Sequence, residues 1–346
     1  MDISSSFVST YFSLIHTLLS AYLSGMPLTA ISLLAALVLF LIMLSIVIIG
    51  FSYVFSYLER KIIARAHGRH GPTYVGPFGF LQNIADFIKL LSKESIVPFS
   101  AEKPLFTIML PLLFGLFVVI MAFIPLTNSF VGINTSLALL AVFVLLSFSP
   151  LLMFLIGWTS GNKFSSISAQ RSVIILVSYE IPMFLVVLSV AMMAGSFNFG
   201  TIVNLQSAGW FIIAMPVGLV VFFIVLLAEL ERPPFDLRDA DSELIAGWLV
   251  EVSAPYYLIS LMLDYTRVLV GSLLVSIMFL GGWLGPTIIP PFGWLMIKVA
   301  LLTIFVMVIR ATTVRMRMDR VLRMGWAYLT PLAVANLLIT FMLFIR

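Results

Sequence analysis

The stretch ELERPPFDLRDADSELIAGWLVE, residues 229–251, is the part of the chain around which the rest is organised. It holds seven carboxylates against two arginines, a local net charge of −5, so the remainder must carry +9 to give the total of +4. Pro233 and Pro234 predict the end of the preceding apolar helix, because proline lacks an amide donor and restricts its predecessor. If the chain becomes helical again at Asp236, the period of 3.6 residues per turn places Asp241 on a different face from the other acids. One face would then carry Asp236, Asp239, Glu243 and Glu251.

The composition is that of a polytopic membrane protein. Hydrophobic residues make up 62% of the chain and charged residues only 10%, and the mean hydropathy is +1.16. A soluble domain has about 25% charged residues. The chain has no cysteine, which excludes disulfides and thiolate-ligated iron–sulfur clusters of its own. Three scattered histidines do not predict a metal centre, and no nucleic-acid partner is expected.

Eight apolar segments approach the length of about 20 residues that a membrane span needs. We therefore expect an all-α integral membrane protein forming a single domain over residues 1–346. The predicted spans lie near residues 28–57, 104–125, 137–157, 173–195, 209–229, 254–283, 292–310 and 327–345. A shorter apolar segment, 7–24, predicts a short interfacial helix within residues 1–27. It lacks the basic start and the cleavage site of a signal peptide.

The loops between these spans fall into two sets. Three of them carry no charged residue, and these lie near residues 126–136, 196–208 and 284–291. The opposite loops carry nearly all the charge, and these are residues 58–103, 158–172, 230–253 and 311–326. Lysine and arginine in short loops mark the cytoplasmic side. We expect a prokaryotic-type plasma membrane, with the basic loops in the cytoplasm and both termini outside.

The first charged loop contains the pattern of an amphipathic helix. After a series of Gly-Pro turns, apolar residues recur at helical spacing between Phe80 and Leu91, while Gln82, Asp86 and Lys89 share the opposite face. The pattern alone favours a helix lying on the bilayer surface. The alternative is that this helix forms the wall of a chamber at the membrane edge.

A series of short motifs follows in order along most of the chain. They are Glu59-Arg60-Lys61, Arg69-His70-Gly71-Pro72, Val75-Gly76-Pro77-Phe78-Gly79, Ala85-Asp86, Gly157-Trp158, Ser178-Tyr179-Glu180, Pro234-Phe235-Asp236, Ser242-Glu243-Leu244, Asp264-Tyr265, Gly281-Gly282-Trp283 and Arg310-Ala311-Thr312. Over roughly residues 28–345 the chain thereby resembles the membrane subunit of respiratory complex I that forms the quinone chamber. This is the family of NADH dehydrogenase subunit 1, with counterparts in membrane-bound hydrogenases and sulfur reductases.

The resemblance implies a role in coupling. In this family, electrons pass through iron–sulfur clusters of peripheral subunits to an acceptor at the cytoplasmic edge of this subunit. The released energy drives ions through antiporter-like membrane subunits. The resemblance therefore implies a quinone-type acceptor, no covalently bound cofactor, and peripheral iron–sulfur and hydrogenase-like partners. Four arginines serve either as topology anchors or as the interface with the peripheral arm: Arg315, Arg317, Arg320 and Arg323.

Two sets of residues are candidates for function. By resemblance, the acceptor chamber is expected to involve Arg60, Arg65, Gly76, Phe80, Asp86, Lys89, Arg232 and Phe235. Carboxylates a few Å apart cannot all ionise freely, so a cluster of them responds to one further charge. Ionisable residues inside spans are costly and usually functional. The expected coupling path comprises Glu180, Glu229, Glu231, Asp236, Asp239, Glu243, Glu251 and Asp264. Arg267 is expected to be the structural partner of Asp264. Lys298 is expected either to take part in the coupling path or to have a purely structural role.

Alternative functions remain at this point. The chain departs from the usual complex I pattern at Thr73, Ile175, Glu231, Pro233 and Val252, where Asn, Gln, Asn, Ala and Tyr are common. The second hypothesis is therefore the same role without quinone, in a ferredoxin-dependent hydrogenase or sulfur reductase. The acidic stretch could also dock a basic peripheral subunit. A stand-alone secondary transporter is a weaker alternative, because such proteins show paired half-repeats and this sequence does not.

Overall fold

The computed structural model describes residues 28–128, 130–238, 241–286 and 288–344, and the regular secondary structure within these ranges is helical. Seven of the described helices are long and apolar enough to cross a membrane, and a shorter apolar helix lies at Pro216–Glu229. The expected all-helical membrane fold with about eight spans is confirmed. The helix expected within residues 1–27 lies outside the described residues.

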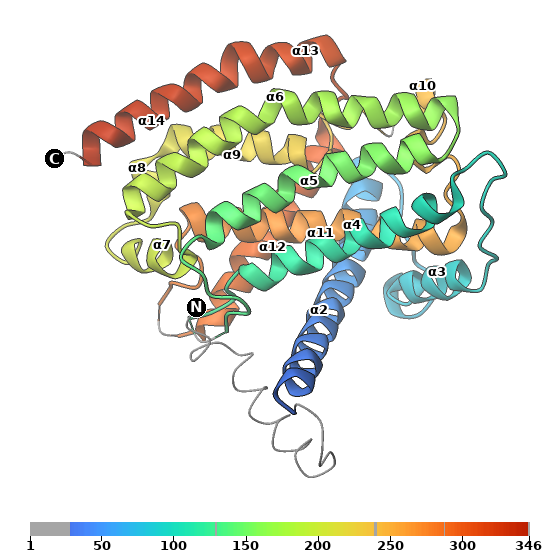
Figure 1. The fold of residues 1–346 in the computed structure, drawn as a ribbon, viewed down its shortest axis with the longest axis horizontal. Coiled ribbons are helices and arrows are strands. Elements are labelled where there is room, and N and C mark those ends of the chain that lie inside the picture. The colour runs from blue at the N-terminus through green and yellow to red at the C-terminus, as the bar shows by residue number, and fades with distance from the viewer. Residues whose placement is uncertain (1–27, 129, 239–240, 287, 345–346) are drawn as a thin grey trace.

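The helices keep the labels of Figure 1. They are α2 (Leu28–Ala66), α3 (Gln82–Leu91), α4 (Lys103–Phe123), α5 (Ala138–Thr159), α6 (Lys163–Ala194), α7 (Phe199–Leu205), α8 (Phe211–Ala214), α9 (Pro216–Glu229), α10 (Asp241–Leu244), α11 (Ala254–Phe279), α12 (Pro291–Thr312), α13 (Met318–Arg323) and α14 (Thr330–Phe344). Two 3₁₀ turns lie at Pro77–Gly79 and Gly247–Leu249, and a π-helical turn at Met324–Leu329 joins α13 to α14.

The long helices form a layer with α11 packed against it. Helices α4, α5, α6 and α14 run side by side in that order (Figure 1), and α9 packs on α6 and α14. Helix α11 contacts α4, α12, α2 and α3, and all its residues from Thr266 to Phe279 are buried. The core of the protein is therefore built around α11, which also carries two of the predicted intramembrane charges.

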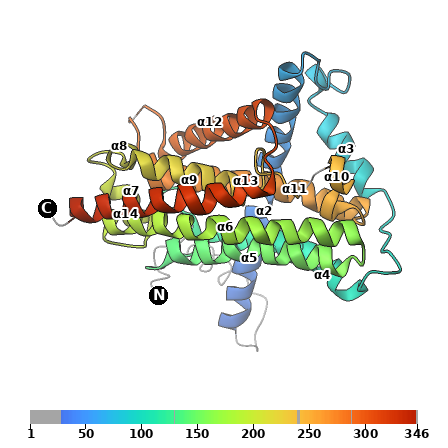
Figure 2. The ribbon, with the colours of Figure 1, turned by 90° about the horizontal axis from the view of Figure 1, so that it is seen from above.

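Helix α2 crosses this layer and projects beyond it (Figure 2). Its 39 residues correspond to about 58 Å at 1.5 Å per residue, nearly twice the hydrocarbon thickness of about 30 Å. The helix continues to Ala66, past the end near residue 57 that we expected. Glu59 and Arg60 are therefore held on a rigid helix, and α3 packs against the same end of α2.

Two other predicted spans also differ from the structure. Helix α6 begins ten residues earlier than predicted, because the Asn162 side chain accepts a hydrogen bond from the Phe164 amide at 2.9 Å and so caps the helix. The predicted span 209–229 is broken into α8 and α9. The break falls at Met215, directly before Pro216, which cannot donate a backbone hydrogen bond.

The continuous acidic helix face after Asp236 is a wrong prediction. Residues 236–251 form only the short helix α10 and one 3₁₀ turn, with Asp239 outside the described residues. Ile245 has φ +65° and Gly247 has φ +56°, values that interrupt a right-handed helix. A Cβ on Gly247 would lie 2.2 Å from the Arg238 carbonyl oxygen, so the chain doubles back tightly on itself there.

The charge-free loops pack together at one end of the bundle. Gln206 donates to the carbonyl of Ile277 at 2.8 Å and accepts from the Gly281 amide at 2.8 Å. Lys298 fixes the same end, because its ammonium donates to the carbonyls of Leu280, Gly282 and Leu284 at 2.7, 2.8 and 2.8 Å. With hydrogen bonds to three carbonyls, Lys298 connects α12 to the end of α11, which favours the structural role over a part in the ion path.

Replacement of Lys298 by methionine is expected to lower stability. It leaves buried carbonyls at the end of α11 without donors, each worth roughly 1–3 kcal/mol, and the variant should melt several degrees below the parent protein in detergent. Lys93→Met removes an exposed lysine and serves as the matched control, with a melting temperature close to the parent value. Equal melting temperatures for the two variants would contradict the anchoring role.

Candidate functional site

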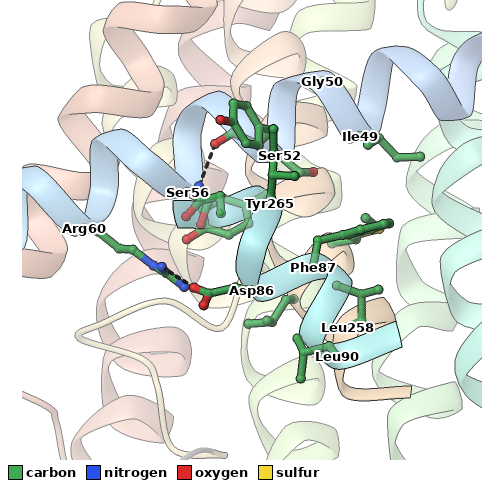
Figure 3. Close-up of a pocket in the computed structure, with 15 residues that line it drawn as sticks. Ile49, Gly50, Ser52, Ser56, Arg60, Asp86, Phe87, Leu90, Leu258 and Tyr265 are labelled. Atoms are coloured by element: carbon green, nitrogen blue, oxygen red, sulfur yellow. Dashed lines mark hydrogen bonds and ion pairs between the residues drawn. The ribbon is translucent and has the colours of Figure 1, made fainter. Parts of the chain in front are cut away.

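A cavity of about 340 Å³ lies between α2, α3 and α11 (Figure 3). Its walls are largely apolar, and α3 contributes Phe87 and Leu90 while α11 contributes Leu258. On α2 the wall includes Gly50, where an added Cβ would have no neighbour within 4 Å. The amphipathic helix predicted in residues 58–103 is present as α3, and one of its faces lines this cavity. Its remaining apolar side chains, among them Ile88 and Leu91, are exposed on the other face.

One part of this cavity is charged. Arg60 Nη1 lies 2.6 Å from Asp86 Oδ2, and Gln82 donates to the other carboxylate oxygen at 3.0 Å. Burial raises the pKa of Asp86, but the hydrogen bonds from Arg60 and Gln82 outweigh burial and hold that pKa below its usual value. Asp86 is therefore ionised at neutral pH. The cavity suits a lipid-soluble molecule that carries a small polar group.

A second, polar cavity of about 390 Å³ shares Arg60 and Tyr265 with the first. It is lined by Arg69 and Arg310, and Glu59 lies at its base. The Glu59 carboxylate is buried and accepts hydrogen bonds from Arg310 and, at 3.0 Å, from Arg232. Arg60 and Tyr265 thus lie between an apolar cavity and a predominantly basic one.

A network of buried charges lies on the other side of α11. Glu231 Oε2 accepts hydrogen bonds from Arg238 Nη1 and, at 2.9 Å, from Arg267 Nη1. Arg238 also reaches Asp264, with Nη2 at 3.5 Å from Oδ1. Glu231, Arg238 and Arg267 are only 5%, 2% and 1% exposed. Charges removed from water in this way require close partners, and here two guanidiniums compensate two carboxylates.

Neighbouring side chains fix the two guanidiniums. Arg267 Nη2 donates to Ser149 Oγ at 2.8 Å and contacts the Met153 sulfur at 2.8 Å, both on α5. The Arg238 guanidinium lies 4.9 Å from the ring centroid of Trp248, a distance typical of a cation–π interaction. The network therefore connects α5, α11 and the acidic stretch.

Two further acids complete this cluster. Glu229, the last residue of α9, has a buried Oε1 that finds no hydrogen-bond partner among the described residues. The charged groups that act on Glu229 are Arg267, Glu231 and Glu180. Four residues of the predicted coupling path, namely Glu180, Glu229, Glu231 and Asp264, are therefore brought together by α6, α9 and α11.

The other described acids of the predicted path are held apart from this cluster by partners on α6 and on the loop before α13. Asp236 pairs with Arg315 at 3.2 Å and Glu243 with Arg171 at 2.7 Å. Glu251 accepts a hydrogen bond from the Asn162 side chain at 2.6 Å. Asp239 lies outside the described residues. These contacts attach the acidic stretch to α6 and to the loop before α13.

Of the predicted chamber residues, only Arg60 and Asp86 line the apolar cavity. Phe80 packs beside it, edge-on against Tyr53 and Tyr57 at 5.0 and 5.5 Å between ring centroids. Arg65, Gly76 and Lys89 are exposed, whereas Arg232 and Phe235 are buried in the core behind α2. The four arginines predicted to face the peripheral arm lie on the segment around α13, and all four are exposed: Arg315, Arg317, Arg320 and Arg323.

Sequence reasoning missed three residues of the site. Tyr265 borders both cavities, and its position next to Asp264 in a recognised motif was the available signal. Arg310 pairs with Glu59 across 251 positions, for which a single sequence offers no signal, whereas Arg238 lies only seven residues from its partner Glu231. In the described ranges, no group of three or more His, Asp or Glu side chains could hold a metal ion.

Comparison with known proteins gives a consistent result. The family model described as NADH dehydrogenase matches residues 37–341. A Dehalococcoides mccartyi protein, named as the H subunit of NADH-quinone oxidoreductase, is 38% identical over 304 residues, which cover 88% of this chain and 86% of that protein. Proteins of the same name from Carboxydothermus hydrogenoformans and Bacillus mycoides are 37% and 35% identical over 287 and 304 residues. These cover 82% and 86% of this chain, and 82% and 91% of the relatives. The resemblance inferred from the motifs is confirmed.

Glu231→Gln tests the buried charge network. Removal of this carboxylate leaves Arg238 and Arg267 without their shared counter-ion, at a cost of roughly 3–5 kcal/mol. We expect a clearly lower melting temperature and a poor yield of assembled complex. Glu243→Gln is the control, since Glu243 is 62% exposed and its pair with Arg171 is worth at most about 1 kcal/mol. Similar melting temperatures for both variants would mean that Glu231 does not hold the network.

Proposed function

This chain belongs to the NADH dehydrogenase family as a complex I membrane subunit, and we propose that its cavity between α2, α3 and α11 receives the quinone headgroup. The single observation that carries the proposal is the apolar cavity with one charged end at Arg60 and Asp86. A quinone is a lipid-soluble ring whose only polar groups are its oxygens. Its size fits a site of about 340 Å³, within the range of about 300–1,000 Å³ typical of ligand pockets.

The second part of the proposal is coupling. Tyr265 borders the cavity, and its chain neighbour Asp264 contacts Arg238 of the buried network. The Asp264 side chain is 26% exposed, whereas Glu231 is almost completely enclosed. A change of charge in the cavity therefore has a short route, through Asp264, to a cluster in which charges are poorly screened. In this proposal that route starts the proton path.

The remaining assignments concern the assembly. We propose that Arg317, Arg320 and Arg323 face a peripheral iron–sulfur partner, and that antiporter-like membrane subunits pack on the bundle. The end that carries the charged loops would lie in the cytoplasm, with both chain termini outside. The clustering of the charge-free loops at the opposite end supports this orientation.

Gly50→Leu tests the cavity directly. A side chain at Gly50 grows into open space within the cavity, so the variant should fold normally and obstruct the ligand. In the intact complex we expect kcat/KM for a ubiquinone analogue to fall at least tenfold, with electron transfer from NADH to ferricyanide unchanged.

The matched control is Gly115→Leu in α4, where an added Cβ also meets nothing within 4 Å but does not border the cavity. Unchanged quinone reduction by Gly50→Leu in an assembled complex would reject the chamber. It would favour the alternative raised by the sequence, a hydrogenase-type or sulfur reductase complex without quinone.

Glu180→Gln and Asp264→Asn test coupling. Both changes preserve size and hydrogen-bonding capacity but remove a titrating proton. We expect assembled complexes that pump fewer protons per electron, measured as proton uptake into sealed vesicles beside NADH oxidation. A purely structural role predicts poor assembly instead. A normal ratio in both variants would reject the proposed path.

A further inference from the structure

A third, much smaller cavity lies between α4, α5, α9 and α11. The space that the centre of a water molecule could occupy in it is about 10 Å³. Only two charged side chains border it in the described part of the chain, Glu229 at the end of α9 and Arg267 on α11. The other walls are apolar or glycine: Phe117, Leu146, Leu226, Leu230, Val270, Gly271 and Leu274.

Each of these two charged residues has one buried polar atom without a hydrogen-bond partner in the described ranges. Arg267 uses Nη1 and Nη2 on Glu231 and Ser149, but its buried Nε has no acceptor within the described ranges. Glu229 Oε1 is likewise buried without a donor from those ranges. An unpaired buried polar group costs about 1–3 kcal/mol, and more when it is charged. Two residues that line the cavity thus supply one unsatisfied donor, Arg267 Nε, and one unsatisfied acceptor, Glu229 Oε1.

We propose that this cavity binds one ordered water, which accepts a hydrogen bond from Arg267 Nε and donates one to Glu229 Oε1. A buried water needs about 10–15 Å³ of such volume and at least two polar partners. The cavity meets the lower limit of volume and supplies two partners of opposite kind. Its size leaves no room for a second water.

The water would complete a line of polar contacts across the core. The line runs from Glu229 through the water and Arg267 to Glu231, and from there through Arg238 to Asp264. Arginine does not release its proton in proteins. Two guanidiniums in series therefore cannot pass a proton, but by reorienting they can pass a change of charge. Arg267 is in this view a positioning residue for Glu229, a role that rests on the proposed coupling function.

The test combines a structure with a functional measurement on the intact complex. A cryo-EM map of the parent complex that resolves ordered waters should show a peak within hydrogen-bonding distance of both Arg267 Nε and Glu229 Oε1. In Gly271→Ala the new methyl stands on the cavity wall and lies 3.2 Å from Leu226 side-chain atoms, which line the same cavity and must shift. We expect the peak to disappear and the protons pumped per electron to fall at least twofold. Gly115→Ala, which adds the same methyl in open space, should change neither.

The outcomes separate the inference from the proposed function. A parent map without the peak overturns the water site, whatever the pumping ratio. A peak that persists in Gly271→Ala places the water outside this cavity and also overturns the assignment. Loss of the peak with an unchanged ratio rejects the coupling role of the water alone. The proposed path itself is judged by Glu180→Gln and Asp264→Asn.

Discussion

The charged end of this protein depends on one interaction, the shared compensation of Arg238 and Arg267 by the Glu231 carboxylate. Each guanidinium is almost fully enclosed, and an ion in such surroundings persists only with a close partner of opposite charge. Arg267 belongs to α11, Arg238 to the acidic stretch, and Ser149 and Met153 of α5 complete the contacts. The path of the chain after α9 is therefore dictated by the need to bring these charges together.

That arrangement has a local cost in the backbone. Glu231 has φ +50°, a left-handed conformation that costs a non-glycine residue of the order of 1–3 kcal/mol. The conformation turns the chain immediately after the last residue of α9 and leaves the Glu231 carboxylate between the two guanidiniums. Glu229 lies at the helix end, two residues before Glu231. Its buried Oε1 has no hydrogen-bond partner among the described groups. Two neighbouring glutamates thereby acquire different electrostatic surroundings.

The sequence predicts the elements of this fold better than their contacts. The lengths of the apolar segments located the spans, and the helical spacing of apolar residues around Asp86 identified α3. Both signals depend on residues that are close in sequence. The helical face predicted from Asp236 to Glu251 is absent, since Ile245 and Gly247 adopt left-handed conformations, and at Gly247 the Arg238 carbonyl lies where a Cβ would stand. Pairings such as Glu59 with Arg310 join residues 251 positions apart. One sequence carries no trace of these pairings, so the site could be predicted only as separate groups of residues.

The anchor at Lys298 has a mechanical consequence. Its ammonium, held on α12, is shared among three carbonyls at the end of α11, and Gln206 ties the α7 segment to the same turn. Sliding of α11 past α12 would break all these bonds at once. At the opposite end, Glu231 and Arg238 of the acidic stretch belong to the buried network, while its exposed acids form weaker, partly hydrated pairs such as Glu243 with Arg171. A displacement that begins near the apolar cavity would therefore reach a helix α11 whose other end is fixed at Lys298.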